Sequence, residues 1–288
     1  MRQKFGWFDG LNYTLMLVLV FVTLFPFLYL VNVSLSDPYY VVRGLVAWWP
    51  KGFTLESYKI ILADHRIPTG YRNTILYTIV YTALGLMLTA MAGYALSRQH
   101  MIFRKFFTLM ILFTMLFSGG MIPTFLVVRE LGIIDTIWGM VLPGVISVWN
   151  LLIMRTFFAG LPSELFDSGE IDGLTDSGVF RHIVLPLSKP VLATMGLFYA
   201  VSMWNNFTGA LLYIRSPDLF PLQVILRNMV LAGQLENDSM MNSADSALTV
   251  ATTLQYSTIM VTTLPILLVY PFIQKYFVKG VLVGSVKA

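Results

Sequence analysis

The sequence predicts an all-α membrane protein with six transmembrane helices, and both its composition and the spacing of its charges support this fold class. Apolar residues make up 57% of the 288 residues and charged residues only 12%, whereas soluble domains have about 45–50% apolar and about 25% charged residues. So few charges would not cover the surface of a soluble protein of this length. A bilayer accepts exposed apolar side chains, so we expect the chain to lie in a membrane.

Six apolar runs contain no Asp, Glu, Lys, Arg or His. A helix needs about 20 residues to cross about 30 Å of hydrocarbon, and every run approaches or exceeds that length. We expect the six runs to form one transmembrane domain over residues 1–288. The predicted spans are approximately residues 13–35, 73–97, 106–128, 136–154, 190–214 and 250–274.

The first run could also be the core of a signal peptide, because Arg2 and Lys4 precede it. It is longer than the apolar core of a signal peptide, which has about 7–15 residues, and no cleavage pattern of small residues follows it. We therefore expect a retained helix. Lys and Arg are enriched in cytoplasmic connections, and a cytoplasmic N-terminus places more of the 19 Lys and Arg residues on that side. Both termini are then expected in the cytoplasm.

The residues that carry most catalytic and metal chemistry are absent or scattered. The chain has no cysteine, and its three histidines, His65, His100 and His182, form no metal-binding spacing. The predicted spans lack the acids, bases and metal ligands that an intramembrane enzyme would need. The net charge of +4 is too small and too dispersed to indicate nucleic-acid binding.

Two of the spans carry groups that suit a substrate pathway. Gly119 and Gly120 interrupt the third span, and such breaks are tolerated where the backbone faces protein or a water-filled cavity. Trp204, Asn205 and Asn206 lie in the fifth span, where amides and an aromatic ring suit the hydroxyl groups and apolar faces of a neutral sugar. The alternatives are close packing through the glycines and hydrogen bonds between helices through the amides.

The most informative segment is residues 161–186, between the fourth and fifth spans. Pro162 and Ser163 predict a helix start, Gly173 predicts a left-handed helix end, and Thr175 predicts the cap of a second helix that stops at Pro186. Five acids in the segment disfavour a helix that lies on an anionic lipid surface. We expect the apolar face of the first helix to dock into a groove of another protein. That face comprises Leu161, Leu165, Phe166 and Gly169.

This segment resembles the coupling motif of the permease subunits of binding-protein-dependent ABC importers, in particular the smaller permease of the maltose-type oligosaccharide branch. The motif runs Glu-Ala-Ala-x-x-x-Gly and is followed further on by Ile-x-Leu-Pro. Here residues 167–173 read Asp-Ser-Gly-Glu-Ile-Asp-Gly, and residues 183–186 read Ile-Val-Leu-Pro. Asp-Ser-Gly thus replaces Glu-Ala-Ala, which keeps the acid but shortens its reach. Residues 50–58, 120–139 and 213–229 also look like this family, so the resemblance covers nearly the whole chain.

The resemblance implies the type I ABC importer permease fold with a cytoplasmic coupling helix, in the cytoplasmic membrane of a bacterium. It implies a heterodimer with a second permease, two ATPase subunits that bind ATP and Mg, and an extracytoplasmic sugar-binding protein. This chain would then be a transport subunit without a cofactor and not an enzyme. The residues that would couple it to the ATPase are Leu165, Phe166, Asp167, Ser168, Gly169, Ile171, Asp172, Gly173, Leu185 and Pro186.

The energy source is expected on another chain, because no G-x-x-x-x-G-K-[ST] phosphate-binding pattern occurs. The alternative function is an ion-gradient-driven secondary sugar transporter. Such transporters usually keep ionisable residues inside their spans. The six predicted spans contain none, so the sequence favours the ATP-driven importer.

Overall fold

The computed structural model describes residues 6–240, 252–265 and 267–268, and within these ranges every regular element is helical. The all-α class predicted from the sequence is therefore confirmed. By its internal contacts the chain divides into two compact units. The first comprises Met1–Pro68 and Ile225–Ile266, and the second comprises Thr69–Val224 and Leu267–Ala288.

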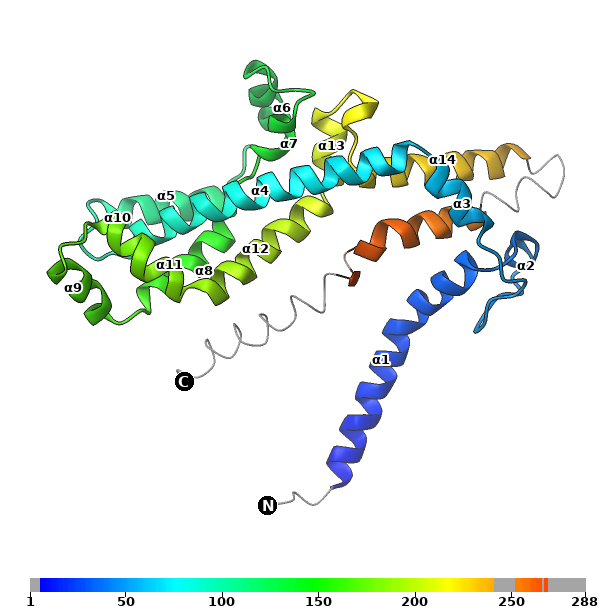
Figure 1. Ribbon diagram of the computed structural model, residues 1–288, viewed down its shortest axis with the longest axis horizontal. Helices are drawn as coiled ribbons and strands as arrows, with labels where there is room; N and C mark the ends of the chain where they lie inside the picture. Colours follow the sequence, from blue (N-terminus) through cyan, green and yellow to red (C-terminus); the bar gives the residue numbers. More distant parts are fainter. Residues whose placement is uncertain (1–5, 241–251, 266, 269–288) are drawn as a thin grey trace. The chain divides into compact units, whose positions relative to one another are not determined.

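The helices follow one another along the chain as Figure 1 labels them. Residues 252–265 form a further helix, and short turns of π-helix (η1, Phe180–Val184) and 3₁₀-helix (η2, Pro217–Leu219) lie between the α-helices. The α-helices are α1 (Trp7–Ser34), α2 (Pro38–Val42), α3 (Glu56–Ala63), α4 (Arg66–Ser97), α5 (Arg104–Leu116), α6 (Met121–Glu130), α7 (Ile137–Val141), α8 (Val148–Ala159), α9 (Ser163–Ile171), α10 (Asp176–Val179), α11 (Leu185–Leu187), α12 (Lys189–Trp204), α13 (Phe207–Tyr213) and α14 (Leu222–Met240).

The first two predicted spans correspond to single helices. Within the described residues, α1 and α4 are the two helices that are long and apolar enough to cross a membrane by themselves. None of the most apolar part of α1 is buried within the chain. The side chains of that part are therefore available to lipid or to another protein.

The next three predicted spans are interrupted. α5 and α6 meet at an angle of 112°, and Gly120 at the break has a φ of +87°, as the paired glycines led us to expect. The fourth span consists of α7 and α8, whose start is capped by Ser147. The fifth span divides into α12 and α13 at Asn205 and Asn206. Of the sixth predicted span, residues 250–274, the structure describes 252–265 and 267–268, and the remainder lies outside the described residues.

In the first unit, the connection after α1 folds back onto that helix. The Asn32 amide donates to the carbonyl of Ala47 at 3.2 Å, and the backbone amide of Lys51 donates to the Ser36 hydroxyl at 3.0 Å. The indole of Trp48 packs against Phe25, with ring centroids 5.1 Å apart, and Trp49 next to it is exposed. These contacts order a segment that is otherwise irregular.

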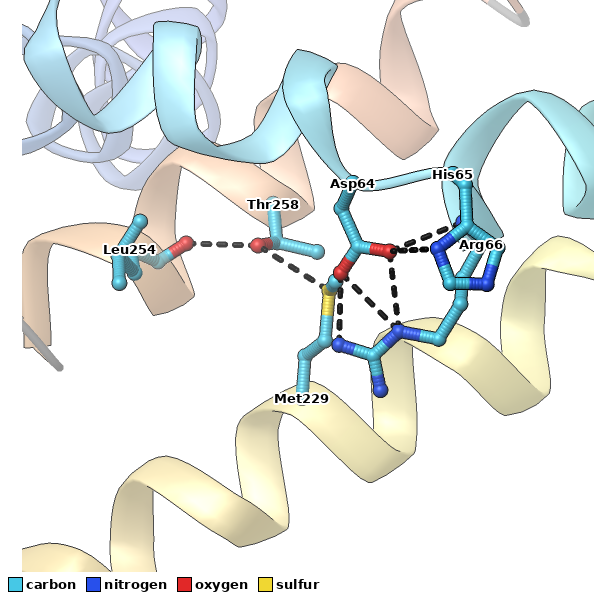
Figure 2. A network of polar contacts seen from close by, with 6 residues as sticks. All are labelled: Asp64, His65, Arg66, Met229, Leu254 and Thr258. Carbon is cyan, nitrogen blue, oxygen red and sulfur yellow. Dashed lines mark hydrogen bonds and ion pairs between the residues drawn. The ribbon is translucent and has the colours of Figure 1, made fainter.

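Polar contacts of the first unit are drawn in Figure 2. At the junction of α3 and α4, Asp64 accepts hydrogen bonds from the guanidinium of Arg66, the shortest at 2.6 Å, and these bonds lower the pKa of Asp64. On the helix of residues 252–265, the Thr258 hydroxyl donates to the carbonyl of Leu254 at 2.7 Å and approaches the sulfur of Met229 on α14 at 3.9 Å. A hydroxyl bonded to its own helix in this way adds no unsatisfied polar group to an apolar environment.

The second unit is built on two apolar clusters, which meet around α4 and α12. Tyr199 of α12 is fully buried, and its hydroxyl pairs with the Thr89 hydroxyl of α4 and accepts from the backbone amide of Ser147 at 3.0 Å. One phenol therefore joins α4, α12 and the start of α8. The first cluster contains Tyr77, Tyr81, Met140, Val141, Tyr199, Met203, Ala210, Ile214 and Val224. The second contains Ala90, Tyr94, Met154, Phe158, Phe166, Val179, Val184, Val191 and Met195.

We expect Tyr199→Phe to lower the free energy of unfolding by about 1–3 kcal/mol, because it leaves the buried Thr89 hydroxyl and the partly buried Ser147 amide without this partner. The measurement is thermal unfolding of the purified chain in detergent. Tyr40→Phe, which removes a hydroxyl from α2, is the matched control and should change stability little. Equal stability of Tyr199→Phe and the wild type would contradict the role given to this phenol.

Candidate functional site

The segment between α8 and α12 forms a tight elbow, and its local structure follows the sequence signals. α9 begins after Pro162 and ends at Ile171. Gly173 then has a φ of +76°, a left-handed conformation that glycine adopts without steric cost. The hydroxyl of Thr175 accepts from the backbone amide of Gly178 and caps α10. The glycine end and the threonine cap predicted from the sequence are both confirmed.

The elbow is closed by a close approach at Gly169. A Cβ atom at this position would lie 2.8 Å from Cδ1 of Ile183 and 2.9 Å from Cγ2 of Val179, closer than side-chain packing allows. The glycine therefore lets the backbone of α9 lie directly against α10 and η1. Phe166, one turn earlier on α9, is buried in the same cluster as Val179.

This packing divides the residues that the sequence analysis grouped as docking residues. Phe166 and Gly169, which we expected on a face turned to another protein, face inward and are buried within the chain. Leu165 and Leu185 are partly buried. The exposed members are Asp167, Ser168, Ile171, Asp172, Gly173 and Pro186. Ile171 is the most exposed of the large apolar side chains in the chain's described part, at 86%.

The far end of the elbow leads into α12 through a sharp bend. η1 and α11 continue α10 as far as Leu187, and the axis of Asp176–Leu187 meets that of α12 at 83°. Pro186 lies in the first turn of α11. The elbow is therefore a compact helical unit joined at both ends to apolar helices, α8 before it and α12 after it.

Sequence reasoning missed the polar residues that hold the elbow in place. Arg98, directly after α4, lies over the ring of Phe166, 4.3 Å from its centroid. Its Nη2 contacts Oε1 of Glu170 at 3.1 Å, and its Nε lies 3.8 Å from Oδ1 of Asp176. The Tyr94 hydroxyl donates to the carbonyl of Asp176 at 3.2 Å. These partners are distant from Arg98 and Tyr94 in sequence, so no local pattern could have identified them.

The candidate pathway residues lie at breaks between helices. Asn205 donates to the carbonyl of Val201 at 3.0 Å and is exposed. Oδ1 of Asn206 accepts from the backbone amide of Gly209 at 2.9 Å and caps α13. The indole nitrogen of Trp204 is buried and finds no hydrogen-bond acceptor in the described parts of the chain. The Asn206 amide therefore has a structural role, whereas the exposed Asn205 amide bonds to its own helix.

Gly119 and Gly120 are exposed between α5 and α6. The helices that follow the two breaks, α6 and α13, contact each other through the stacked rings of Phe125 and Tyr213, whose centroids are 6.3 Å apart. Each of the two predicted breaks is therefore followed by a helix, and these two helices, α6 and α13, pack against each other.

The carboxylate of Asp135 binds the segment that follows α13. This contact was not predicted from the sequence. The carboxylate accepts the hydroxyl of Ser216 and the backbone amides of Ser216 and Arg215, at 2.9 and 2.8 Å. The hydroxyl bond first, and then the two amide bonds, lower the pKa of Asp135. Asp135 has a φ of +61°, a backbone conformation that few residues other than glycine, Asn and Asp adopt.

Comparison with known proteins identifies the class. The model of the family described as "Binding-protein-dependent transport system inner membrane component" matches residues 4–283. The chain belongs to this family. It is therefore a multi-pass permease subunit of the inner membrane, as the resemblance seen in the sequence implied.

Individual relatives agree with this assignment. The chain is 40% identical to a polygalacturonan/rhamnogalacturonan transport system permease protein of Bacillus subtilis over 97% of this chain and 98% of that protein. It is 42% identical to the protein LplC of the same organism, over 92% and 90%. A solved bacterial ABC transporter involved in the import of the acidic polysaccharide alginate superposes with a TM-score of 0.85 at 30% identity, covering 96% of this chain and 99% of that chain. The fold is thus that of a type I ABC importer permease, as predicted.

We expect Gly173→Val to lower the free energy of unfolding of this permease by about 1–2 kcal/mol, because a side chain with a Cβ is disfavoured at this positive φ. Gly173→Asn is the matched control, since Asn tolerates the left-handed region better than other residues with a side chain. The measurement is thermal unfolding in detergent. Equal stability of the Val and Asn variants would show that the elbow does not need the left-handed turn.

Proposed function

We propose that this permease pairs with a second permease and forms the pathway of an ATP-driven importer, whose sugar is delivered by an extracytoplasmic binding protein. Membership of the binding-protein-dependent family is the observation that carries this proposal. The substrate we propose is an oligosaccharide derived from an acidic polysaccharide. Support comes from the names of two relatives, one of which transports polygalacturonan and rhamnogalacturonan and the other alginate.

In this proposal the elbow transmits motion from a separate ATPase, which binds ATP and Mg. Residues 163–172 present an exposed surface that includes Asp167, Ser168, Ile171 and Asp172. A short helix with one apolar side chain standing out among acids suits a groove in a partner protein. Phe166 and Gly169 support the helix from inside, because both are buried. Movement of the ATPase would then carry α8 and α12 as a rigid body.

The proposal places both termini in the cytoplasm and the elbow on the same side as the ATPase. The balance of Lys and Arg between the predicted connections supports this orientation. The connection after α1 and the turn held by Asp135 then face the binding protein. Trp204, Asn205 and Asn206, with the break at Gly119 and Gly120, are proposed to line the pathway. The support is that Asn205 and the two glycines are exposed at breaks between helices, where irregular backbone at membrane depth is tolerated beside a cavity.

The test of the proposed function is reconstitution of the permease in vesicles with its second permease, its ATPase and its binding protein. We expect uptake of oligogalacturonate only when ATP is supplied on the ATPase side. Vesicles with Gly173→Val should hydrolyse ATP but import less sugar per ATP. Uptake driven by a proton or sodium gradient without the ATPase would contradict the proposal and favour the secondary transporter.

The pathway assignment is tested by Asn205→Ala combined with Asn206→Ser, because serine preserves a side-chain cap for α13. We expect uptake in the same vesicles to fall by about two- to tenfold, the loss of roughly one hydrogen bond to the sugar. Purification of the intact complex is the control for assembly. Wild-type uptake by this double variant would assign the two amides to helix packing instead.

A further inference from the structure

Arg98 bridges the two sides of the Gly173 elbow. Its guanidinium lies 4.3 Å from the ring centroid of Phe166 and 3.1 Å from Glu170, both on α9 before the turn. It also lies 3.8 Å from Asp176, the first residue of α10 after the turn. The side chain is only 14% exposed, and a charge so far removed from water is costly unless it is paired. One cation therefore contacts both arms of the elbow.

Neighbouring contacts extend this junction along the last turns of α4. The ring of Tyr94 packs against that of Phe180 at 4.9 Å, and its hydroxyl donates to the carbonyl of Asp176. From the end of α8, Nε of Arg155 donates to the carbonyl of Leu96 at 3.3 Å. The end of α4 thus contacts elements that lie before, within and after the turn.

Chain connectivity alone would pass a displacement of α9 only to α8 and α12, because these are the helices joined to the elbow. α4 is distant in sequence and follows the elbow only through noncovalent contacts. A planar guanidinium stacked on a ring and paired with carboxylates resists sliding better than a flexible ammonium group. The contacts of Arg98 and Tyr94 therefore connect α4 to the elbow without passing through α8 or α12.

We propose that Arg98 is a positioning residue that makes α4 move with the elbow, so that motion of α9 reaches the spans through α4 as well as through α8 and α12. This inference rests on the proposed function, in which α9 receives motion from an ATPase. Arg98 acts through Phe166, Glu170 and Asp176. It is assigned no contact with sugar or nucleotide.

The test uses the reconstituted importer with Arg98→Met, which keeps an unbranched side chain and removes the charge. We expect the complex to assemble and to hydrolyse ATP at a rate within about twofold of the wild type, while sugar imported per ATP falls about tenfold, within the usual range of coupling between sites. Arg98→Lys should recover part of this ratio, because it restores the charge without the planar stack. Lys105→Met, at an exposed position early in α5, is the control and should keep the wild-type ratio.

A wild-type ratio of sugar to ATP in Arg98→Met would overturn the inference. A parallel loss of hydrolysis and uptake in the assembled complex would also overturn it, because it would indicate a defect in docking rather than in transmission. Should Arg98→Met fail to assemble, Glu170→Gln removes one acidic partner at an exposed site and should lower the same ratio. An unchanged ratio in that variant would overturn the inference.

A readout that does not depend on transport separates this inference from the proposed function. Hydrogen exchange of the purified chain should be faster over residues 163–179 in Arg98→Met than in the wild type and in Lys105→Met, since the junction that holds the elbow is lost. Unchanged exchange would overturn the role of Arg98 even in a working importer. Absence of ATP-dependent uptake by the wild type, with faster exchange in the variant, would overturn the proposed function but leave the junction at Arg98 established.

Discussion

The close packing of α9 against α10 and η1 is the contact on which the rest of the elbow depends. Gly169 allows it, because a Cβ would approach Val179 and Ile183 within 2.9 Å, and Phe166 fills the space beside it. A helix of nine residues is too short to be stable by itself in water. Held in this way, it can present a fixed surface and pass on a displacement without unfolding.

The apolar character of the predicted spans explains why the proposed function gives the elbow between α8 and α12 a central role. The predicted spans contain no Asp, Glu, Lys, Arg or His, so a proton or ion gradient has no evident charged group on which to act. Family membership assigns the chain to a transport system made of several components. We therefore infer that the energy source lies on a partner and that the breaks between α5 and α6 and between α12 and α13 respond to it.

The sequence was sufficient for the helical class, the family resemblance and the turn at Gly173, because charge-free runs and a glycine between two helix caps are local signals. It did not reveal that Phe166 faces inward, since an apolar side chain suits a partner groove and an internal core equally well. Nor did it reveal the pairing of Arg98 with Glu170, which lies 72 residues away. The division of the fourth span into α7 and α8 was also missed, because an apolar run carries no information about the direction of its backbone.

The orientation of the elbow is the central claim, and Ile171 offers the most direct measurement. The chain has no cysteine, so Ile171→Cys creates a single thiol at a position that is 86% exposed. The account predicts that a thiol reagent unable to cross membranes leaves this residue unlabelled in intact cells and labels it in inverted vesicles that lack the ATPase. Labelling in intact cells would place the elbow on the outer face and contradict the account.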